Sequence, residues 1–223
     1  MPFKLGIDEA GRGPVLGPLV IAGCLIDEKH ERKLKKWGVK DSKKLTRKKR
    51  EELEIKIKEI AETFEIIRIY PSEIDSHSIS GVNLNDLEAH TASEIINRIN
   101  RGFTEISVII DCPSPNREAY NELVKSKILK LPDLKSVSSE HKADVNHISA
   151  SAASILAKCV RDREMDILKE KYGEVGSGYC HDPITIKFIR ENLKKLKDDV
   201  IFRKTWETWK TAVAESEQKT LFE

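Results

Sequence analysis

Two adjacent acids near the N-terminus, Asp8 and Glu9, are the residues of this sequence best suited to chemistry. They directly follow a short apolar run, residues 5–7, so they lie where a strand is expected to end. Carboxylate oxygens at a strand end are ligands that a hard divalent cation such as Mg²⁺ prefers. An acidic pair before a glycine is also ordinary solvated turn chemistry. The pair alone therefore leaves both interpretations open.

A glycine-flanked arginine comes next, in Gly11, Arg12 and Gly13. The glycines leave their backbone N–H groups unobstructed and the arginine adds a fixed positive charge, which together can hold a phosphate oxygen. A dinucleotide-binding oxidoreductase also uses a glycine-rich turn, but its third glycine follows three residues later and a helix begins there. Here the next glycine is Gly17, and residues 14–16 lead into a predicted strand. The spacing argues against that class of enzyme.

Two further acids occupy comparable places. Asp111 ends the predicted strand 105–111, and Asp144 lies between the last predicted strand and a long predicted helix. Taken singly, a turn explains Asp111 and helix capping explains Asp144. Strands that end at the same edge of a sheet, however, place such acids close together.

With Asp8 and Glu9, these residues make four acids, enough to hold two divalent cations. Two such ions roughly 3.5–4 Å apart activate a water and stabilise the departing oxygen of a phosphodiester. Successive residues of an ideal strand point to opposite faces, so both Asp8 and Glu9 reach one site only if the chain leaves the strand at Glu9. The sequence therefore predicts a two-metal site with a local irregularity.

Five segments have the β-branched or alternating character of strands: residues 3–8, 19–26, 64–70, 105–111 and 134–139. Only a Gly/Pro turn separates the first two, so they are predicted to pair antiparallel, whereas helices between the later strands predict parallel pairing. The predicted fold class is α/β, a mixed five-stranded sheet flanked by helices, with a helical C-terminal extension.

Apolar spacing predicts helices at residues 47–63, 84–100, 116–129, 148–172, 183–195 and 204–215. Thr46 is the expected N-cap of the first of these helices. The small residues 149–154 are expected to let the long helix approach the sheet closely. The predicted domains are a catalytic domain, residues 1–172, and a helical extension packed on it, residues 173–223.

The chain has 223 residues and a net charge of only +2, but residues 32–50 hold eleven Lys and Arg and a single acid. This block is either a phosphate-binding surface or a solvated Lys-rich helix face. The four cysteines lie far apart, so free thiols in a reducing compartment are expected. No apolar run approaches the ~20 residues of a membrane span, so a cytoplasmic location is expected. The Lys and Glu content, with one glutamine, indicates a thermophilic source.

Seven segments carry a resemblance to a known family: GIDEAGRGPVLGP (6–18), KDSKKLT (40–46), IDCPSPN (110–116), EHKADVN (140–146), SAASILAKCVRDR (151–163), GSGY (176–179) and RKTW (203–206). Together they resemble type 2 ribonuclease H (ribonuclease HII) of the archaeal kind, over nearly the whole chain. The resemblance implies a ribonuclease H-like fold and Mg²⁺- or Mn²⁺-dependent cleavage of the RNA strand of RNA/DNA hybrids. It also implies incision 5′ of single ribonucleotides in duplex DNA, leaving 3′-hydroxyl and 5′-phosphate ends.

By position, the resemblance places the family's acidic tetrad, the catalytic ligands of two divalent ions, on Asp8, Glu9, Asp111 and Asp144. Its Gly-Arg-Gly element falls on Gly11, Arg12 and Gly13, and senses the ribose 2′-hydroxyl and the neighbouring phosphate. Only that hydroxyl distinguishes a ribonucleotide at a given site, so close backbone approach is required there.

The family's tyrosine, which packs against the sugar at an RNA–DNA junction, falls on Tyr179. Its stretch near the nucleic-acid backbone falls on Asp41, Ser42 and Lys43. Family members often follow the tyrosine with Pro-Ser, whereas this chain has Cys180-His181, a departure that bears on the stiffness of the loop.

Two other features have alternative interpretations. His141 and His147 are read as structural histidines rather than as acids that protonate the leaving group. Residues 218–223 resemble the start of the peptide with which DNA-processing enzymes bind a sliding clamp, but they lack its closing pair of aromatics, and a polar tail is the ordinary alternative.

The expected partners are RNA/DNA hybrids and ribonucleotide-containing duplex DNA, and the chain is expected to be monomeric. A non-catalytic hybrid-binding module remains a second functional class. The four acids discriminate against it, because acids lining a phosphate groove oppose binding unless a metal neutralises them.

Overall fold

The structure is a computed structural model that describes residues 3–40, 42–103 and 105–221, without the side chains of residues 219–221. The chain divides into two compact units, each built from several segments. Unit 1 comprises residues 1–10, 20–67 and 84–160, and unit 2 comprises residues 11–19, 68–83 and 161–223. The predicted boundary after residue 172 is a different division, and it stays a prediction.

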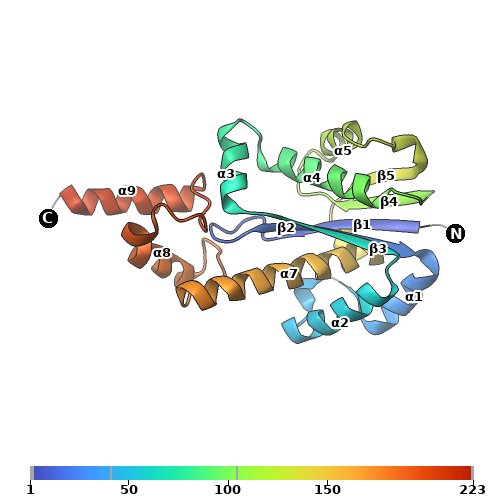
Figure 1. The fold of residues 1–223 in the computed structure, drawn as a ribbon, viewed down its shortest axis with the longest axis horizontal. Helices are drawn as coiled ribbons and strands as arrows, with labels where there is room; N and C mark the ends of the chain where they lie inside the picture. Colours follow the sequence, from blue (N-terminus) through green and yellow to red (C-terminus); the bar gives the residue numbers. More distant parts are fainter. Residues whose placement is uncertain (1–2, 41, 104, 222–223) are drawn as a thin grey trace. The chain divides into compact units, whose positions relative to one another are not determined.

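Five strands form one mixed sheet in the order β3-β2-β1-β4-β5 (Figure 1). Their bounds are Phe3–Ala10 (β1), Leu19–Asp27 (β2), Thr63–Ile69 (β3), Ile106–Asp111 (β4) and Leu134–Glu140 (β5). Strand β1 pairs antiparallel with β2 and parallel with β4, and β4 pairs parallel with β5. The predicted mixture of strand directions is confirmed.

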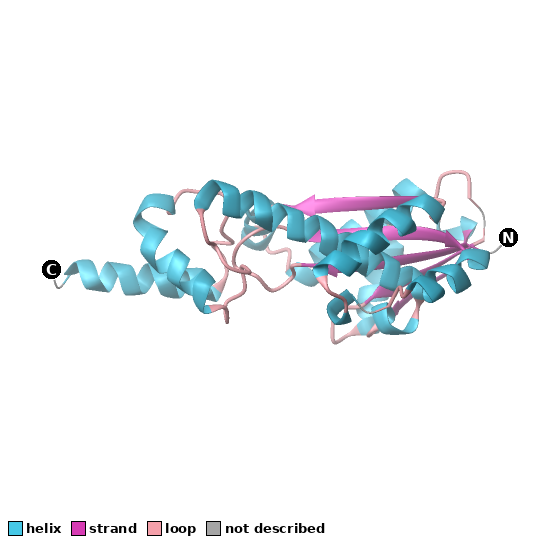
Figure 2. Ribbon diagram, turned by 90° about the horizontal axis from the view of Figure 1, so that it is seen from below, coloured by secondary structure: helices cyan, strands magenta, loops and turns pink. Residues whose placement is uncertain are grey.

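Helices cover both faces of the sheet in unit 1 (Figures 1 and 2). They are α1 (Glu28–Trp37), α2 (Arg47–Ile60), α4 (Leu84–Ile99), α5 (Arg117–Ser126) and the first part of α7 (Ile148–Tyr172). Buried side chains of α1, α2 and α7 pack with those of β1 and β2 in one apolar cluster. Thr46 caps α2 as predicted, because its side chain accepts a hydrogen bond from Lys49 N–H.

Strand β1 and helix α7 approach each other closely at Gly6. A Cβ atom at this position would lie 2.0 Å from the carbonyl carbon of Ser149 and 2.1 Å from the nitrogen of Ala150. Ala152 and Ala153, small residues that follow in α7, are buried in one apolar cluster with residues of β1 and β2. The predicted close approach of a small-residue helix is confirmed, and it requires a glycine in the strand as well.

Unit 2 is held by its own apolar cluster, in which Leu16 and Phe202 form a β-bridge and Phe202 stacks on Trp209 at 4.5 Å between ring centroids. Its helices are α3 (Pro71–Ile79), α8 (Pro183–Leu196), α9 (Glu207–Leu221) and the last part of α7. The helical C-terminal region is therefore confirmed.

Two helices, α1 and α3, are absent from the sequence prediction. Helix α1 buries only Leu34, and its Lys-rich surface hides the apolar periodicity. Helix α3 is short and starts at Pro71, and its buried residues include Asp75, which accepts hydrogen bonds from the backbone N–H groups of Lys204 and Thr205. The first half of the basic block is thus a solvated helix face.

Three short helical turns complete the secondary structure that the described residues form: η1 (Ser42–Lys44), η2 (Leu131–Asp133) and α6 (Ala143–Asn146). None of the described helices is long and apolar enough to cross a membrane. All four cysteines are free thiols, as predicted, and Cys180 is exposed whereas the other three are buried.

Candidate active site

Neighbouring strands β1 and β4 place the first acids together. Their parallel register pairs Ile7 with Ile110, so the next residues along the two strands are Asp8 and Asp111. Asp8, Glu9 and Asp111 each offer a carboxylate oxygen, and these oxygens all lie within 4.8 Å of one another. Asp8 is buried, and Glu9 and Asp111 are half-buried. The predicted meeting of acids at one sheet edge is confirmed for these three residues.

Glu9 reaches the cluster without leaving the strand. Strand β1 continues to Ala10, and Glu9 stays paired with Ile21 of β2, so the predicted strand end at Asp8 is wrong. The parallel pairing with β4 stops at Ile7, and the N–H of Glu9 donates to Asp8 Oδ1 at 2.7 Å. The last residues of β1, from Asp8 to Ala10, therefore pair with β2 and not with β4.

The three acids do not all favour the charged form in this environment. Burial, with the charge of Asp111, raises the pKa of Asp8 to about 7. Burial and then the charge of Asp8 raise the pKa of Glu9. Burial also raises the pKa of Asp111, although the N–H of Ala143 donates to its Oδ1 at 2.7 Å and opposes the shift. A divalent cation would remove this repulsion, so the donor set fits Mg²⁺ or Mn²⁺.

Asp144 lies near this cluster, but its carboxylate is not part of the group of oxygens from Asp8, Glu9 and Asp111 that lie within 4.8 Å of one another. It is buried, and its charge raises the pKa values of Asp8 and Asp111. Asp144 does not cap helix α6, because Lys142 occupies its N-cap position. The carboxylate of Asp144 instead lies 3.9 Å from the ammonium of Lys43.

Ser42 and Lys43, both predicted to contact nucleic acid, have different surroundings. The Lys43 side chain is largely exposed, and its charge partly opposes the rise that burial causes in the pKa of Asp111. Ser42 is buried, and its hydroxyl bonds that of Ser154 at 2.8 Å. Because Ser154 also bonds Asp8, Ser42 is placed to support an acid of the cluster rather than to meet a ligand directly. Asp41 lies outside the described residues.

In unit 2, hydrogen bonds from the Arg203 side chain hold the turn of Gly11, Arg12 and Gly13. The Arg203 side chain is fully buried, and its guanidinium donates to the carbonyl oxygens of Arg12 and Gly11 at 2.6 Å each. Gly11 has φ +84, and a Cβ there would lie 2.7 Å from the carbonyl oxygen of Pro18. Gly11 is therefore required by the backbone.

Tyr179 lies beside this turn. Its Cε1 atom would be 3.7 Å from a Cβ built on Gly13, an ordinary contact, and Gly13 itself is exposed. The guanidinium of Arg161 lies over the Tyr179 ring, 5.4 Å from its centroid. The structure thus brings together the two elements predicted to recognise the ribose, and it leaves the Gly13 backbone accessible.

Arg161 and Arg203 are the residues of this region that sequence reasoning missed. Both occur in matching segments, but no role follows from their positions in the sequence. Arg161 is buried against Gly11, where it donates to the carbonyl oxygen of Ser177 at 3.0 Å. A buried arginine can be recognised only once its backbone carbonyl partners are known, because arginine is ordinarily a surface residue.

The two histidines fit their structural interpretation. His147 Nε2 lies 2.8 Å from Glu140 Oε2, and His141 Nδ1 lies 3.1 Å from the carbonyl oxygen of Cys112. The bond to His147 lowers the pKa of Glu140. Each histidine thus has a specific protein partner.

Comparison with known proteins agrees with this geometry. The family model for Ribonuclease HII matches residues 5–209. Ribonuclease HII of Methanococcus maripaludis (strain C7) is 43% identical over 222 residues, which cover 98% of this chain and 90% of the relative. That of Methanocaldococcus jannaschii is 41% identical, with 97% of each chain covered.

Solved structures give the same result. The ribonuclease H2 of Pyrococcus horikoshii superposes with a TM-score of 0.87 at 39% identity, covering 97% of this chain and 99% of that one. A chain from the PCNA:RNase HII complex of Archaeoglobus fulgidus has a TM-score of 0.80 at 36% identity, covering 93% and 94%. The predicted ribonuclease H-like fold is confirmed. The chain belongs to the ribonuclease HII family, ribonucleases that cleave the RNA strand of RNA/DNA hybrids.

Proposed function

We propose that this chain hydrolyses the RNA strand of RNA/DNA hybrids and also incises duplex DNA on the 5′ side of a single embedded ribonucleotide. Water attacks the phosphorus, the bond to the 3′ oxygen breaks, and the products carry a 3′-hydroxyl and a 5′-phosphate. The observation that carries the proposal is the meeting of the Asp8, Glu9 and Asp111 oxygens within 4.8 Å at the ends of adjacent strands.

Asp8, Glu9, Asp111 and Asp144 would hold two divalent cations. When bound, such ions supply Lewis-acid activation of water and stabilise negative charge on the departing oxygen. The protein fixes the ligands beforehand: Ala143 N–H orients the Asp111 carboxylate, and Ser154 orients that of Asp8. Secondary contacts of this kind hold ligands in one geometry and raise metal affinity.

Recognition of the ribonucleotide belongs to the turn of Gly11, Arg12 and Gly13 and to Tyr179. The exposed Gly13 backbone permits close approach of a 2′-hydroxyl, and the Arg12 guanidinium suits a phosphate. The half-buried Tyr179 ring offers a flat face to a sugar. Lys43 adds positive charge for the nucleic-acid backbone, whereas Ser42 acts through Ser154 on the acids.

The test is cleavage of an end-labelled DNA duplex that contains one ribonucleotide, beside an all-DNA duplex, with Mg²⁺, Mn²⁺ or a chelator. The expected result is one cut, 5′ of the ribonucleotide, only with metal. Asp8→Asn and Asp111→Asn should lose the cut while keeping the wild-type circular dichroism spectrum. Cleavage of the all-DNA duplex would contradict ribose recognition, and undiminished cleavage by either variant would remove that acid from the metal site.

A sliding clamp is the partner proposed for the C-terminus. The similar chain from Archaeoglobus fulgidus was solved with PCNA, and here helix α9 runs to Leu221, with Phe222 and Glu223 outside the described residues. The intact protein, proposed to be a monomer, should bind a clamp, and a protein without residues 218–223 should not. Size-exclusion chromatography of each protein with and without clamp tests both statements, and retained binding by the truncated protein would assign the contact elsewhere.

A further inference from the structure

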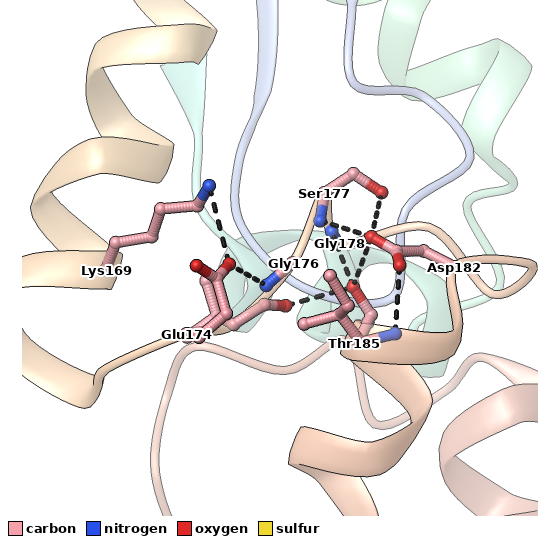
Figure 3. Close-up of polar contacts among 9 residues, drawn as sticks. Lys169, Glu174, Gly176, Ser177, Gly178, Asp182 and Thr185 are labelled. Atoms are coloured by element: carbon pink, nitrogen blue, oxygen red, sulfur yellow. Dashed lines mark hydrogen bonds and ion pairs between the residues drawn. The ribbon is translucent and has the colours of Figure 1, made fainter.

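The loop that carries Tyr179 is held by the first turn of helix α8 (Figure 3). It contains two glycines with positive φ, Gly176 at +71 and Gly178 at +85. Glycine loses more conformational entropy on folding than any other residue. A loop with two glycines therefore needs specific contacts to adopt one conformation. The contacts come from two side chains, Asp182 and Thr185.

Asp182 closes the loop with its carboxylate. Its Oδ2 atom accepts hydrogen bonds from both the backbone N–H and the hydroxyl of Ser177, each at 2.6 Å. Its Oδ1 atom accepts from the N–H of Ile184 at 3.0 Å and so caps helix α8. The same residue donates its own N–H to the carbonyl oxygen of Tyr179 at 3.1 Å. Asp182 thus ties the start of helix α8 to the loop at two points, at Ser177 through its side chain and at Tyr179 through its backbone N–H.

Thr185 fixes the interior of the loop. Its side chain is fully buried, and its hydroxyl accepts from the N–H of Gly178 and donates to the carbonyl oxygen of Val175, both at 2.9 Å. Asp182 Oδ2 lies 3.3 Å from the Thr185 hydroxyl oxygen and is a second acceptor for the hydroxyl hydrogen. Removing this hydroxyl would leave two buried backbone groups unsatisfied, a costly loss.

The loop is also hydrogen-bonded to the turn that precedes β2, at Val15 and Leu16. The carbonyl oxygen of Gly178 accepts from the N–H groups of Val15 and Leu16, at 2.9 Å and 3.4 Å. On its other side, the carbonyl oxygen of Ser177 accepts from Arg161, whose guanidinium lies over the Tyr179 ring. The position of the ring beside Gly13 therefore depends on the conformation of residues 176–178.

We infer that Asp182 and Thr185 are positioning residues for ribonucleotide recognition, acting through Tyr179 by locking the loop of residues 176–179. The inference rests on the proposed function of Tyr179. The family that the chain resembles often has Pro-Ser at the positions of Cys180 and His181. Hydrogen bonds from α8 supply the stiffness, so a proline in the loop is not needed.

The experiment compares Thr185→Val, which keeps the shape of the side chain and removes the hydroxyl, with Thr185→Ser, which keeps the hydroxyl. The readout is the ratio of kcat/KM on a duplex with one ribonucleotide to kcat/KM on a uniform RNA/DNA hybrid. We expect Thr185→Val to lower this ratio about ten-fold, since small misplacements of recognition groups have effects of that order or larger. Thr185→Ser should keep the wild-type ratio.

A double-mutant cycle with Tyr179→Ala tests whether the effect passes through the tyrosine. If it does, Thr185→Val changes the ratio little in the Tyr179→Ala background, because coupled residues are not additive. An equal loss on both substrates, or a full effect in the Tyr179→Ala background, would overturn the inference and leave Thr185 a purely structural residue.

Asp182→Asn provides a second route, which also serves if Thr185→Val does not fold. Asparagine has one acceptor oxygen instead of two, so it keeps either the helix cap or the bonds to Ser177 but not both. Its matched control is Asp199→Asn, which alters a carboxylate bonded to the Tyr172 hydroxyl at 2.8 Å, outside this loop.

The ratio should fall for Asp182→Asn and stay at the wild-type value for Asp199→Asn; an unchanged ratio for Asp182→Asn would contradict the inference. If the wild-type protein does not cut the single-ribonucleotide duplex, the proposed function fails and this inference falls with it. If the wild type cuts and the variants keep its ratio, only this inference fails.

Discussion

The guanidinium of Arg203 donates to the carbonyl oxygen of Gly11 at 2.6 Å, across 192 positions of sequence. The arginine is fully buried, and its guanidinium carbon lies 5.0 Å from the centroid of the Trp206 ring. Carbonyl dipoles stabilise the buried charge here, and the planar fork of arginine matches several of them at once. The residues proposed to meet the ribose are thus fixed by a residue near the other end of the chain.

Arg203→Lys should lower the free energy of unfolding by about 3 kcal/mol, because lysine keeps the charge but leaves buried carbonyl oxygens without donors. Chemical denaturation measures the change. Arg190→Lys is the control, since Arg190 is exposed and its ion pair with Glu215 is worth about 0–1 kcal/mol. Equal effects of the two substitutions would show that the Arg203 contacts contribute little.

Divalent cations should stabilise the folded protein against heat. A cation at 100 times its Kd adds about 2.7 kcal/mol if it binds only the native state, and the clustered acids make such binding favourable. Asp111→Asn should lose most of the shift in Tm produced by Mg²⁺ or Mn²⁺, while its amide oxygen still accepts from Ala143 N–H. Asp199→Asn should keep the shift. A wild-type Tm that neither Mg²⁺ nor Mn²⁺ changes would contradict the prediction that the clustered acids bind a divalent cation.

The stability contributed by Asp182 should depend on pH. Hydrogen bonds from Ser177, first from its hydroxyl, lower the pKa of Asp182 to about 2, from 3.8. Since the folded state favours the carboxylate, this stabilisation is present above about pH 4 and is lost as the pH falls towards 2. The Tm difference between the wild type and Asp182→Asn should therefore be largest at pH 5–7 and shrink in acid. A Tm difference that stays constant from pH 7 down to about pH 2 would argue against the charged interaction.

Two glycine substitutions should differ in their effect on stability. Gly6→Ala should destabilise the protein by about 3 kcal/mol or more, because its Cβ would overlap the backbone of Ser149 in α7. Gly13→Ala should change stability by less than about 1 kcal/mol, since its Cβ makes only ordinary contact with Tyr179. We expect Gly13→Ala to impair cleavage at a single ribonucleotide nonetheless. Thermal unfolding and cleavage rates, measured together, separate the two effects, and wild-type cleavage by Gly13→Ala would remove this residue from ribose recognition.

Local patterns in the sequence were sufficient for much of the fold. Short connections and intervening helices predict which strands pair antiparallel and which pair parallel, and the chain has both as expected. Thr46 acts within its own helix, so its role as a cap follows from its neighbours alone. Asp111 ends its strand where the apolar run stops. Each of these features depends on residues a few positions apart.

The arrangement of the site depends on contacts between distant segments, and these only the tertiary structure decides. The carboxylates of Glu9 and Asp8 meet at the end of β1, where the pairing with β4 has stopped at Ile7 although the strand itself continues. Ser42 is buried, and its hydroxyl is hydrogen-bonded to that of Ser154 in α7, 112 positions away in the sequence. Arg203 is buried because backbone carbonyls near Gly11 accept its hydrogen bonds. The sequence determined which residue types are available for metal binding and recognition. Burial and long-range hydrogen bonding, which depend on packing rather than on local pattern, decided which of them meet and in what state of charge.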